Sequence, residues 1–118
     1  MHELALTEGI INIVESEKKK HGFERVSAIS LKIGEYSGVI PECVEEFFPI
    51  ASKGTAADGA KLIFEKVPAK FECRECDWHG GLEKGSFACP VCGGESLKMT
   101  AGREFYVENI TVEQTTDR

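Results

Sequence analysis

Four of the five cysteines have the spacing of a metal site. They stand as two C-x2-C pairs separated by twelve residues: Cys73, Cys76, Cys89 and Cys92. Two residues between thiolates let one turn present both sulfurs to one ion, and two such turns complete a tetrahedron of Zn–S bonds of about 2.3 Å. The quartet therefore predicts a structural zinc site. The alternatives are a four-thiolate iron centre and a pair of redox dithiols, and four convergent thiolates favour an ion over the dithiols.

Catalysis is not expected at this ion or elsewhere in the chain. Four protein ligands fill the coordination sphere of zinc, so no position is open for water or substrate. None of the three histidines sits in a catalytic motif, and no nucleophile or acid/base pair is recognisable. The fifth cysteine, Cys43, stands alone and is expected to pack as a small buried hydrophobe. The sequence thus predicts a protein that is not an enzyme.

A second candidate metal site lies in the first three residues, Met-His-Glu. The amine of Met1, the backbone amide nitrogens of His2 and Glu3 and the His2 imidazole can supply four nitrogens, a set that can wrap a divalent metal ion. An oxygen of Glu3 or Glu42 would instead make the site six-coordinate. Because the amine must lose its proton to bind, metal affinity should fall as the pH drops. The alternative is a frayed terminus without a role.

The elements expected around these sites form a small α+β domain. Apolar residues recur at helical spacing from Glu3 to Lys20, and a second helix is expected from Pro41 onward, with a kink or an early end at Pro49. Strands are expected over 25–36, 60–69 and 104–113. Because the first strand alternates like a half-buried one, the sheet is expected to be antiparallel.

Residues 69–101 interrupt this domain. They are rich in glycine, short on aliphatic side chains and hold the cysteine quartet, so they need a metal in place of a hydrophobic core. We therefore expect a small antiparallel three-stranded sheet with two helices, plus an inserted four-cysteine zinc-ribbon module. In this division residues 1–68, completed by a strand in 102–118, form an α/β domain that carries the N-terminal site, and residues 69–101 form the zinc-binding domain.

Charge and hydropathy exclude several classes of partner. Twenty acidic residues against 14 basic ones give a net charge of -6, which repels nucleic-acid phosphates. The zinc segment itself carries five acidic and four basic residues, before the negative charge of four thiolates around zinc is added. No apolar run is long enough to span a bilayer, and the start lacks the pattern of a signal peptide. We expect a cytoplasmic protein that binds neither nucleic acid nor membrane.

Together these features resemble the HypA/HybF family of hydrogenase maturation factors. The resemblance rests on the "MHE" start, the "KIGEYSGVIPE" region, the "PAKFEC" entry into the zinc module and the final "GREFYVENITVE", and it covers essentially the whole chain. It implies a nickel metallochaperone that assists nickel insertion into [NiFe] hydrogenase. It also implies that Met1 and His2, with Glu3 beside them, form the nickel site of a nickel-binding domain (1–68 with 102–118) and that the four cysteines hold zinc. The four nitrogens of the N-terminal site agree with this, because they suit square-planar Ni(II).

The resemblance further implies partners. These are a HypB-type GTPase, the hydrogenase large subunit and, where urease is also served, urease accessory proteins, with the chain itself a monomer or weak homodimer. Some family members add a carboxylate before the second helix or a histidine in the zinc module, and the nearby candidates here are Glu42 and His79. Without the resemblance, the cysteines alone also fit a zinc-ribbon module for protein interaction or nucleic-acid binding, which would leave "MHE" unexplained. The acidic residues Glu42, Glu45 and Glu46 form either a docking face or a solvated helix face.

Overall fold

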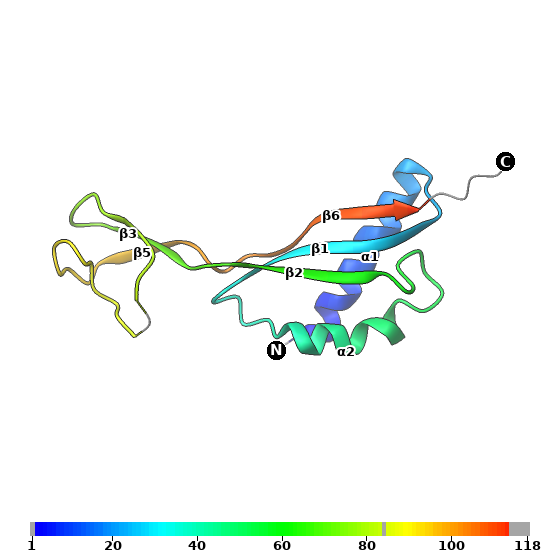
Figure 1. The fold of residues 1–118 in the computed structure, drawn as a ribbon, viewed down its shortest axis with the longest axis horizontal. Helices are drawn as coiled ribbons and strands as arrows, with labels where there is room; N and C mark the ends of the chain where they lie inside the picture. Colours follow the sequence, from blue (N-terminus) through cyan, green and yellow to red (C-terminus); the bar gives the residue numbers. More distant parts are fainter. Residues whose placement is uncertain (1, 84, 114–118) are drawn as a thin grey trace. The chain divides into compact units, whose positions relative to one another are not determined.

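The computed structural model describes residues 2–83 and 85–113. Its elements, in chain order, are α1 (Glu3–His21), β1 (Arg25–Gly34), α2 (Pro41–Ala51), β2 (Lys61–Val67), β3 (Lys70–Cys73), β4 (His79–Gly80), β5 (Leu97–Ala101) and β6 (Phe105–Glu113) (Figure 1). The strands form two three-stranded sheets, ordered β2-β1-β6 and β4-β3-β5. The α+β class, the two helices and the inserted four-cysteine module are confirmed.

The chain divides into two compact units. The first comprises the described residues up to Lys32, Val39–Glu65 and those from Tyr106 onward. The second comprises Ile33–Gly38 and Lys66–Phe105. The domain limits expected from composition, 1–68 with 102–118 and 69–101, stay a prediction.

Helix α1 buries one apolar stripe and ends at a glycine. Its apolar positions Ile10, Ile11 and Val14 are buried at helical spacing. Four basic residues occupy the last turn, where they complement the negative pole of the helix dipole. Gly22 then adopts a left-handed φ of 74°, and its N–H donates to the Lys18 carbonyl at 2.8 Å. The C-terminal end of the helix is thereby fixed.

One strand of the first sheet runs in a direction that differs from the expectation. Lys32 Nζ lies 2.8 Å from Glu65 Oε2, and the N–H of Glu35 donates to the Val67 carbonyl at 2.9 Å. Residue numbers therefore rise together along β1 and β2, so these two strands are parallel. The physical reason is the connection between the two strands. In the sequence α2 follows β1 and precedes β2, and it carries the chain back to the end of the sheet at which β1 begins, as a parallel crossover requires (Figure 1).

The third strand keeps the expected antiparallel direction. Ser27 Oγ donates to the Thr111 carbonyl at 3.3 Å, whereas the N–H of Gly34 donates to the Glu104 carbonyl at 2.7 Å. Residue numbers fall along β6 as they rise along β1. The sheet is therefore mixed, with β1 as its central strand.

Helix α2 contributes one buried stripe to the core of the first unit. Pro41 occupies the first turn, and Val44 and Phe48 are buried, as are Ile29 and Leu31 of β1. Of the two outcomes expected at Pro49, a kink or an early end, the early end is wrong, because the helix continues to Ala51. Pro49 has no N–H, so the intrahelical hydrogen bond that a residue at this position would donate is absent.

No helix in the described part of the chain is long and apolar enough to cross a membrane.

Candidate metal centres

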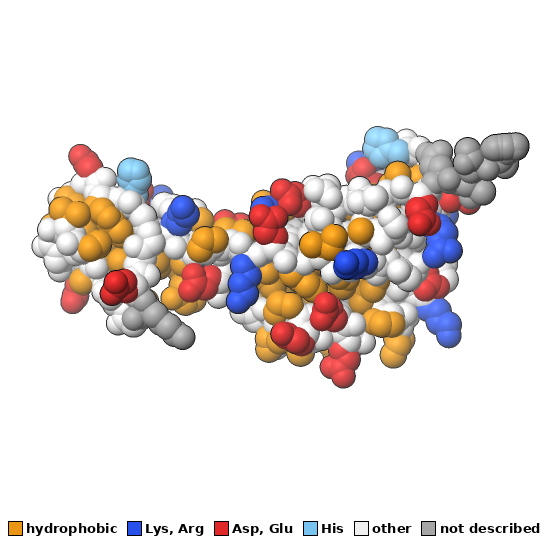
Figure 2. All heavy atoms as spheres, in the orientation of Figure 1, with side chains coloured by type: hydrophobic (Ala, Val, Ile, Leu, Met, Phe, Trp, Pro, Cys, Tyr) orange, Lys and Arg blue, Asp and Glu red, His pale blue; other side chains and the backbone are white. Residues whose placement is uncertain are grey.

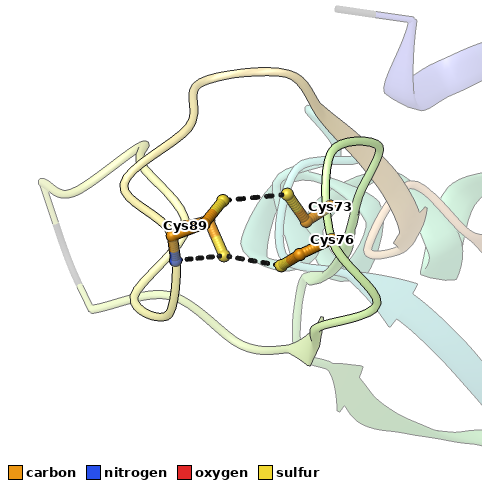
Figure 3. Close-up of side chains that lie close together, drawn as sticks. Cys73, Cys76 and Cys89 are labelled. Atoms are coloured by element: carbon orange, nitrogen blue, oxygen red, sulfur yellow. Dashed lines mark hydrogen bonds between the residues drawn. The ribbon is translucent and has the colours of Figure 1, made fainter.

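The four cysteine side chains converge in the second unit. Cys73 and Cys76 come from the end of β3 and the turn after it, and Cys89 and Cys92 come from the turn that precedes β5. Figure 3 shows the side chains of Cys73, Cys76 and Cys89 pointing toward one another. All four sulfurs lie within 4.8 Å of one another, with Cys73 and Cys92 separated by 3.7 Å and Cys76 and Cys89 by 3.6 Å. Sulfurs around a tetrahedral zinc ion with bonds of about 2.3 Å lie about 3.8 Å apart. The quartet therefore fits zinc.

The two cysteine pairs sit in turns of the same geometry. The N–H of Cys73 donates to the Trp78 carbonyl at 2.9 Å, and the N–H of Cys89 donates to the Gly94 carbonyl at 2.8 Å. In each turn the backbone N–H two residues further on donates to the first sulfur at 3.4 Å. Such N–H groups favour the thiolate, which is the form that binds metal. The backbone of each turn is thus arranged around sulfur.

The neighbouring thiols shift one another's pKa in opposite directions. The Trp78 N–H lowers the pKa of the Cys76 thiol, but burial and the other three sulfurs outweigh it and raise that pKa to about 12. Burial raises the pKa of Cys89, but the N–H groups of Cys92 and Val91 and the neighbouring thiols outweigh it and lower that pKa to about 7. Four adjacent thiolates repel one another, and a divalent cation is the group that lets all four ionise.

Gly94 lies close to side chains of both cysteine turns. A Cβ on Gly94 would come within 2.9 Å of Glu75 Oε1 and 3.3 Å of Cys92 Sγ. The Glu75 carboxylate therefore lies against the second turn, and it adds negative charge to the thiolate cluster. Local sequence spacing had no means of showing this contact.

The described part of the second candidate site lies at the start of α1. His2 is exposed and immediately precedes the helix, and its carbonyl accepts the N–H of Leu6 at 2.9 Å. Glu3 is buried, and its carboxylate accepts the backbone N–H of Ile40 at 3.2 Å. Thr7 Oγ1 donates to the Glu3 carbonyl at 2.6 Å. The first turn is thus tied to the segment before α2, while Met1 lies outside the described residues.

The two further candidate ligands, Glu42 and His79, belong to different units. A surface depression beside His2 is lined by Glu3, Leu4, Ala5, Glu8, Cys43 and Phe47. Glu42 is exposed in the first turn of α2 and does not line it. His79 belongs to the second unit, where it pairs with Glu72 across the β3–β4 ladder. Among residues 2–83 and 85–113, only the cysteine quartet brings three or more such ligand atoms together.

We expect the hydrogen bond from the Ile40 N–H to the Glu3 carboxylate to stabilise the nickel-free protein above acidic pH. This stabilisation should be lost in acid. Burial raises the pKa of Glu3 and the N–H groups of Ile40 and of Glu3 itself act in the opposite direction, and the net effect is a pKa below the ordinary value of 4.5. A lowered folded-state pKa contributes stability that is present above the unfolded value and is lost as the pH falls through the folded value. Urea unfolding of wild type and Glu3→Gln should be measured from about pH 6 to pH 3. The free energy of unfolding should fall less steeply with decreasing pH in the variant than in wild type. Parallel profiles would contradict this role.

Comparison with known proteins identifies the family. A model of the family described as "Hydrogenase/urease nickel incorporation, metallochaperone, hypA" matches residues 1–112. The hydrogenase maturation factor HypA of Caldanaerobacter subterraneus subsp. tengcongensis is 38% identical over 114 residues, which cover 96% of this chain and 100% of the relative. The HypA of Dehalococcoides mccartyi strain CBDB1 is 39% identical over 113 residues, covering 96% of this chain and 95% of the relative.

Solved structures share the fold. The solution structure of a HypA protein matches with a TM-score of 0.77 at 19% identity and covers 98% of both chains. The solution structure of the nickel metallochaperone HypA from Helicobacter pylori matches with a TM-score of 0.71 at 19% identity, covering 98% of this chain and 100% of that one. With the full-length family match, the conclusion is that the chain belongs to the HypA family of hydrogenase and urease nickel-incorporation metallochaperones, non-catalytic maturation factors, and carries a four-cysteine zinc site.

Proposed function

We propose that this chain binds Ni(II), its cargo, through Met1, His2 and Glu3, and that the four cysteines hold zinc for a structural purpose. The observation that carries the nickel proposal is the placement of His2. Its carbonyl is the first acceptor of the α1 ladder, so the helix fixes the His2 backbone while its side chain stays exposed. A cargo site at this point is accessible to a receiving protein.

The start of a helix also suits nitrogen ligation. The first four N–H groups of an α-helix have no acceptor within the helix, so amide nitrogens of His2 and Glu3 can bind a metal without breaking the α1 ladder. The Glu3 carboxylate accepts the Ile40 N–H, which supports a contribution from the backbone nitrogen of Glu3 rather than from its side chain. We therefore favour a four-nitrogen plane over a six-coordinate site with a Glu3 oxygen. X-ray absorption distinguishes the two.

We propose that the nickel passes to a [NiFe] hydrogenase large subunit with the help of a HypB-type GTPase, and to urease accessory proteins where urease is the client. The family-level match supports a role in hydrogenase or urease maturation, and the sequence resemblance supports these particular partners. We place this activity in the cytoplasm, where the reducing environment keeps four thiolates available for zinc.

The test is a calorimetric nickel titration of untagged, zinc-loaded protein with its native first residue. We expect His2→Gln to weaken nickel binding by more than about 100-fold, because loss of a direct ligand exceeds the roughly 10- to 100-fold cost of losing an outer-shell partner. His21→Gln is the matched control, since His21 lies at the other end of α1. His79→Gln tests whether the candidate histidine of the second unit contributes to nickel binding. Equal nickel binding by wild type and His2→Gln would overturn the proposed nickel site.

A further inference from the structure

Helix α2 carries two apolar stripes, of which only one is buried. Val44 and Phe48 pack into the core. Cys43, Phe47 and Ile50 follow one another at i, i+4 and i+7, yet Phe47 is 39% exposed and Ile50 is 81% exposed. Cys43, expected from the sequence to be buried, is only half-buried. A helix needs one apolar stripe to join its own core, so the second stripe is available to another molecule.

Helix α1 supplies the opposite wall of a groove along this second stripe. The depression beside His2 is lined by Leu4, Ala5 and Glu8 of α1 and by Cys43 and Phe47 of α2. Leu4 is 47% exposed. Ile50 continues the α2 wall one turn further, because it follows Phe47 by three residues. We call this feature the α1–α2 groove.

The rim of the α1–α2 groove is negatively charged. Glu42 and Glu46 lie four residues apart on the exposed side of α2, and Glu46 stands four residues before Ile50. Glu8 adds a carboxylate from α1. The sequence contains no Lys or Arg in residues 2–17 or 38–52. Figure 2 shows hydrophobic and acidic side chains beside one another over α2. An apolar floor with an acidic rim selects a partner that is apolar in the middle and basic at its edges.

We propose that the α1–α2 groove docks an amphipathic helix of a partner protein, with an apolar stripe flanked by Lys and Arg. A second copy of this chain fits poorly, because a symmetric contact would bring the Glu42 and Glu46 carboxylates of both copies together. An anionic membrane surface is repelled by the same carboxylates. The docking proposal goes beyond nickel binding and does not require it. Only the functional relevance of having the groove beside His2 rests on the proposed function.

The test uses two synthetic helical peptides and nickel-free, zinc-loaded protein. Both peptides carry leucines at i, i+4 and i+7, flanked by lysines in one peptide and by glutamates in the other. We expect the lysine peptide to bind more tightly than the glutamate peptide, with an affinity that falls as salt rises. Fluorescence anisotropy of the labelled peptides measures both affinities.

Matched variants locate the binding surface. Glu46→Lys should weaken the lysine peptide about fivefold, because one favourable rim charge becomes a repulsive one. Glu45→Lys makes the same change of net charge one residue away, on a different face of α2, and should have little effect. Ile50→Ser should weaken binding about tenfold through loss of apolar contact. Ile13→Ser is its control, since Ile13 is 45% exposed but lies on another face of α1 than Leu4.

Each contrary outcome overturns the proposal. Equal binding of the two peptides, equal effects of Glu46→Lys and Glu45→Lys, or no effect of Ile50→Ser would remove the groove as the docking site. Sedimentation that shows self-association abolished by Ile50→Ser would assign the groove to a second copy. Binding to phosphatidylserine vesicles through Ile50 would assign it to a membrane. Nickel titration of Ile50→Ser should match wild type, so failure of this proposal and failure of the nickel proposal are distinguishable.

Discussion

Cys73→Ser is expected to lose the bound zinc and with it the fold of the zinc-binding segment, whereas the first unit keeps its structure. Within the described part of residues 66–105 the buried apolar residues are only Ala69, Phe71, Cys73 and Cys89, so half of this small core consists of metal ligands. A structural zinc site contributes on the order of 10 kcal/mol to the folding of a comparable module. No set of so few apolar side chains replaces that energy.

Two measurements check this expectation. Metal analysis should give one zinc per wild-type chain and none for Cys73→Ser, and amide NMR spectra should lose dispersion for the second unit alone. Cys43→Ser is the matched control, because Cys43 lies on α2 outside the quartet. If Cys73→Ser kept one zinc and unchanged spectra in the second unit, the quartet would not be the zinc site.

The zinc site should also respond to pH with a definite sign. The Cys76 pKa is raised to about 12 and the Cys89 pKa is lowered to about 7, so zinc must displace protons to bind all four sulfurs. Zinc affinity should therefore fall as the pH falls. The zinc-binding segment should unfold over the same range of pH in which zinc is released, because zinc release and unfolding of the module are coupled.

The features that the sequence predicted well are those that depend on local spacing. Each C-x2-C pair presents its two sulfurs from one turn, and all four sulfurs converge as this spacing predicted. The helices follow from 3.6-residue periodicity and from Pro41 and Gly22 at their ends. Such patterns depend on a few neighbouring residues, so they survive in the folded protein.

The features that the sequence did not predict depend on distant residues. A half-buried strand alternates in the same way in either direction, so the pattern in β1 did not reveal that β2 runs parallel to it. The contact between Glu3 and Ile40 joins positions 37 residues apart. The two stripes of α2 look alike in a list of apolar residues, and only packing shows that Phe48 is buried while Ile50 is exposed. These facts belong to tertiary structure.

Gly34→Ala is expected to destabilise the protein by about 4 kcal/mol, at the upper end of the range for single substitutions. A Cβ at this position would overlap the carbonyl group of Gly102 and approach the Arg103 nitrogen to 2.7 Å. These are backbone atoms, which cannot rotate away as the end of a side chain can. They are also held in place, because the Gly34 N–H donates to the Glu104 carbonyl at 2.7 Å and the Tyr36 N–H donates to the Gly102 carbonyl at 2.6 Å. Relief of the overlap must break these bonds.

A second glycine distinguishes this steric effect from the general cost of changing glycine. Gly9 lies within α1, and a Cβ there would meet no atom within 4 Å. Gly9→Ala should therefore stabilise the protein by about 0.5–1 kcal/mol, because alanine loses less backbone entropy in a helix. Urea unfolding of zinc-loaded wild type and both variants gives the comparison. Opposite shifts of the two midpoints are expected, and a Gly34→Ala midpoint equal to that of wild type would show that the close approach of β1 to Gly102 does not hold in solution.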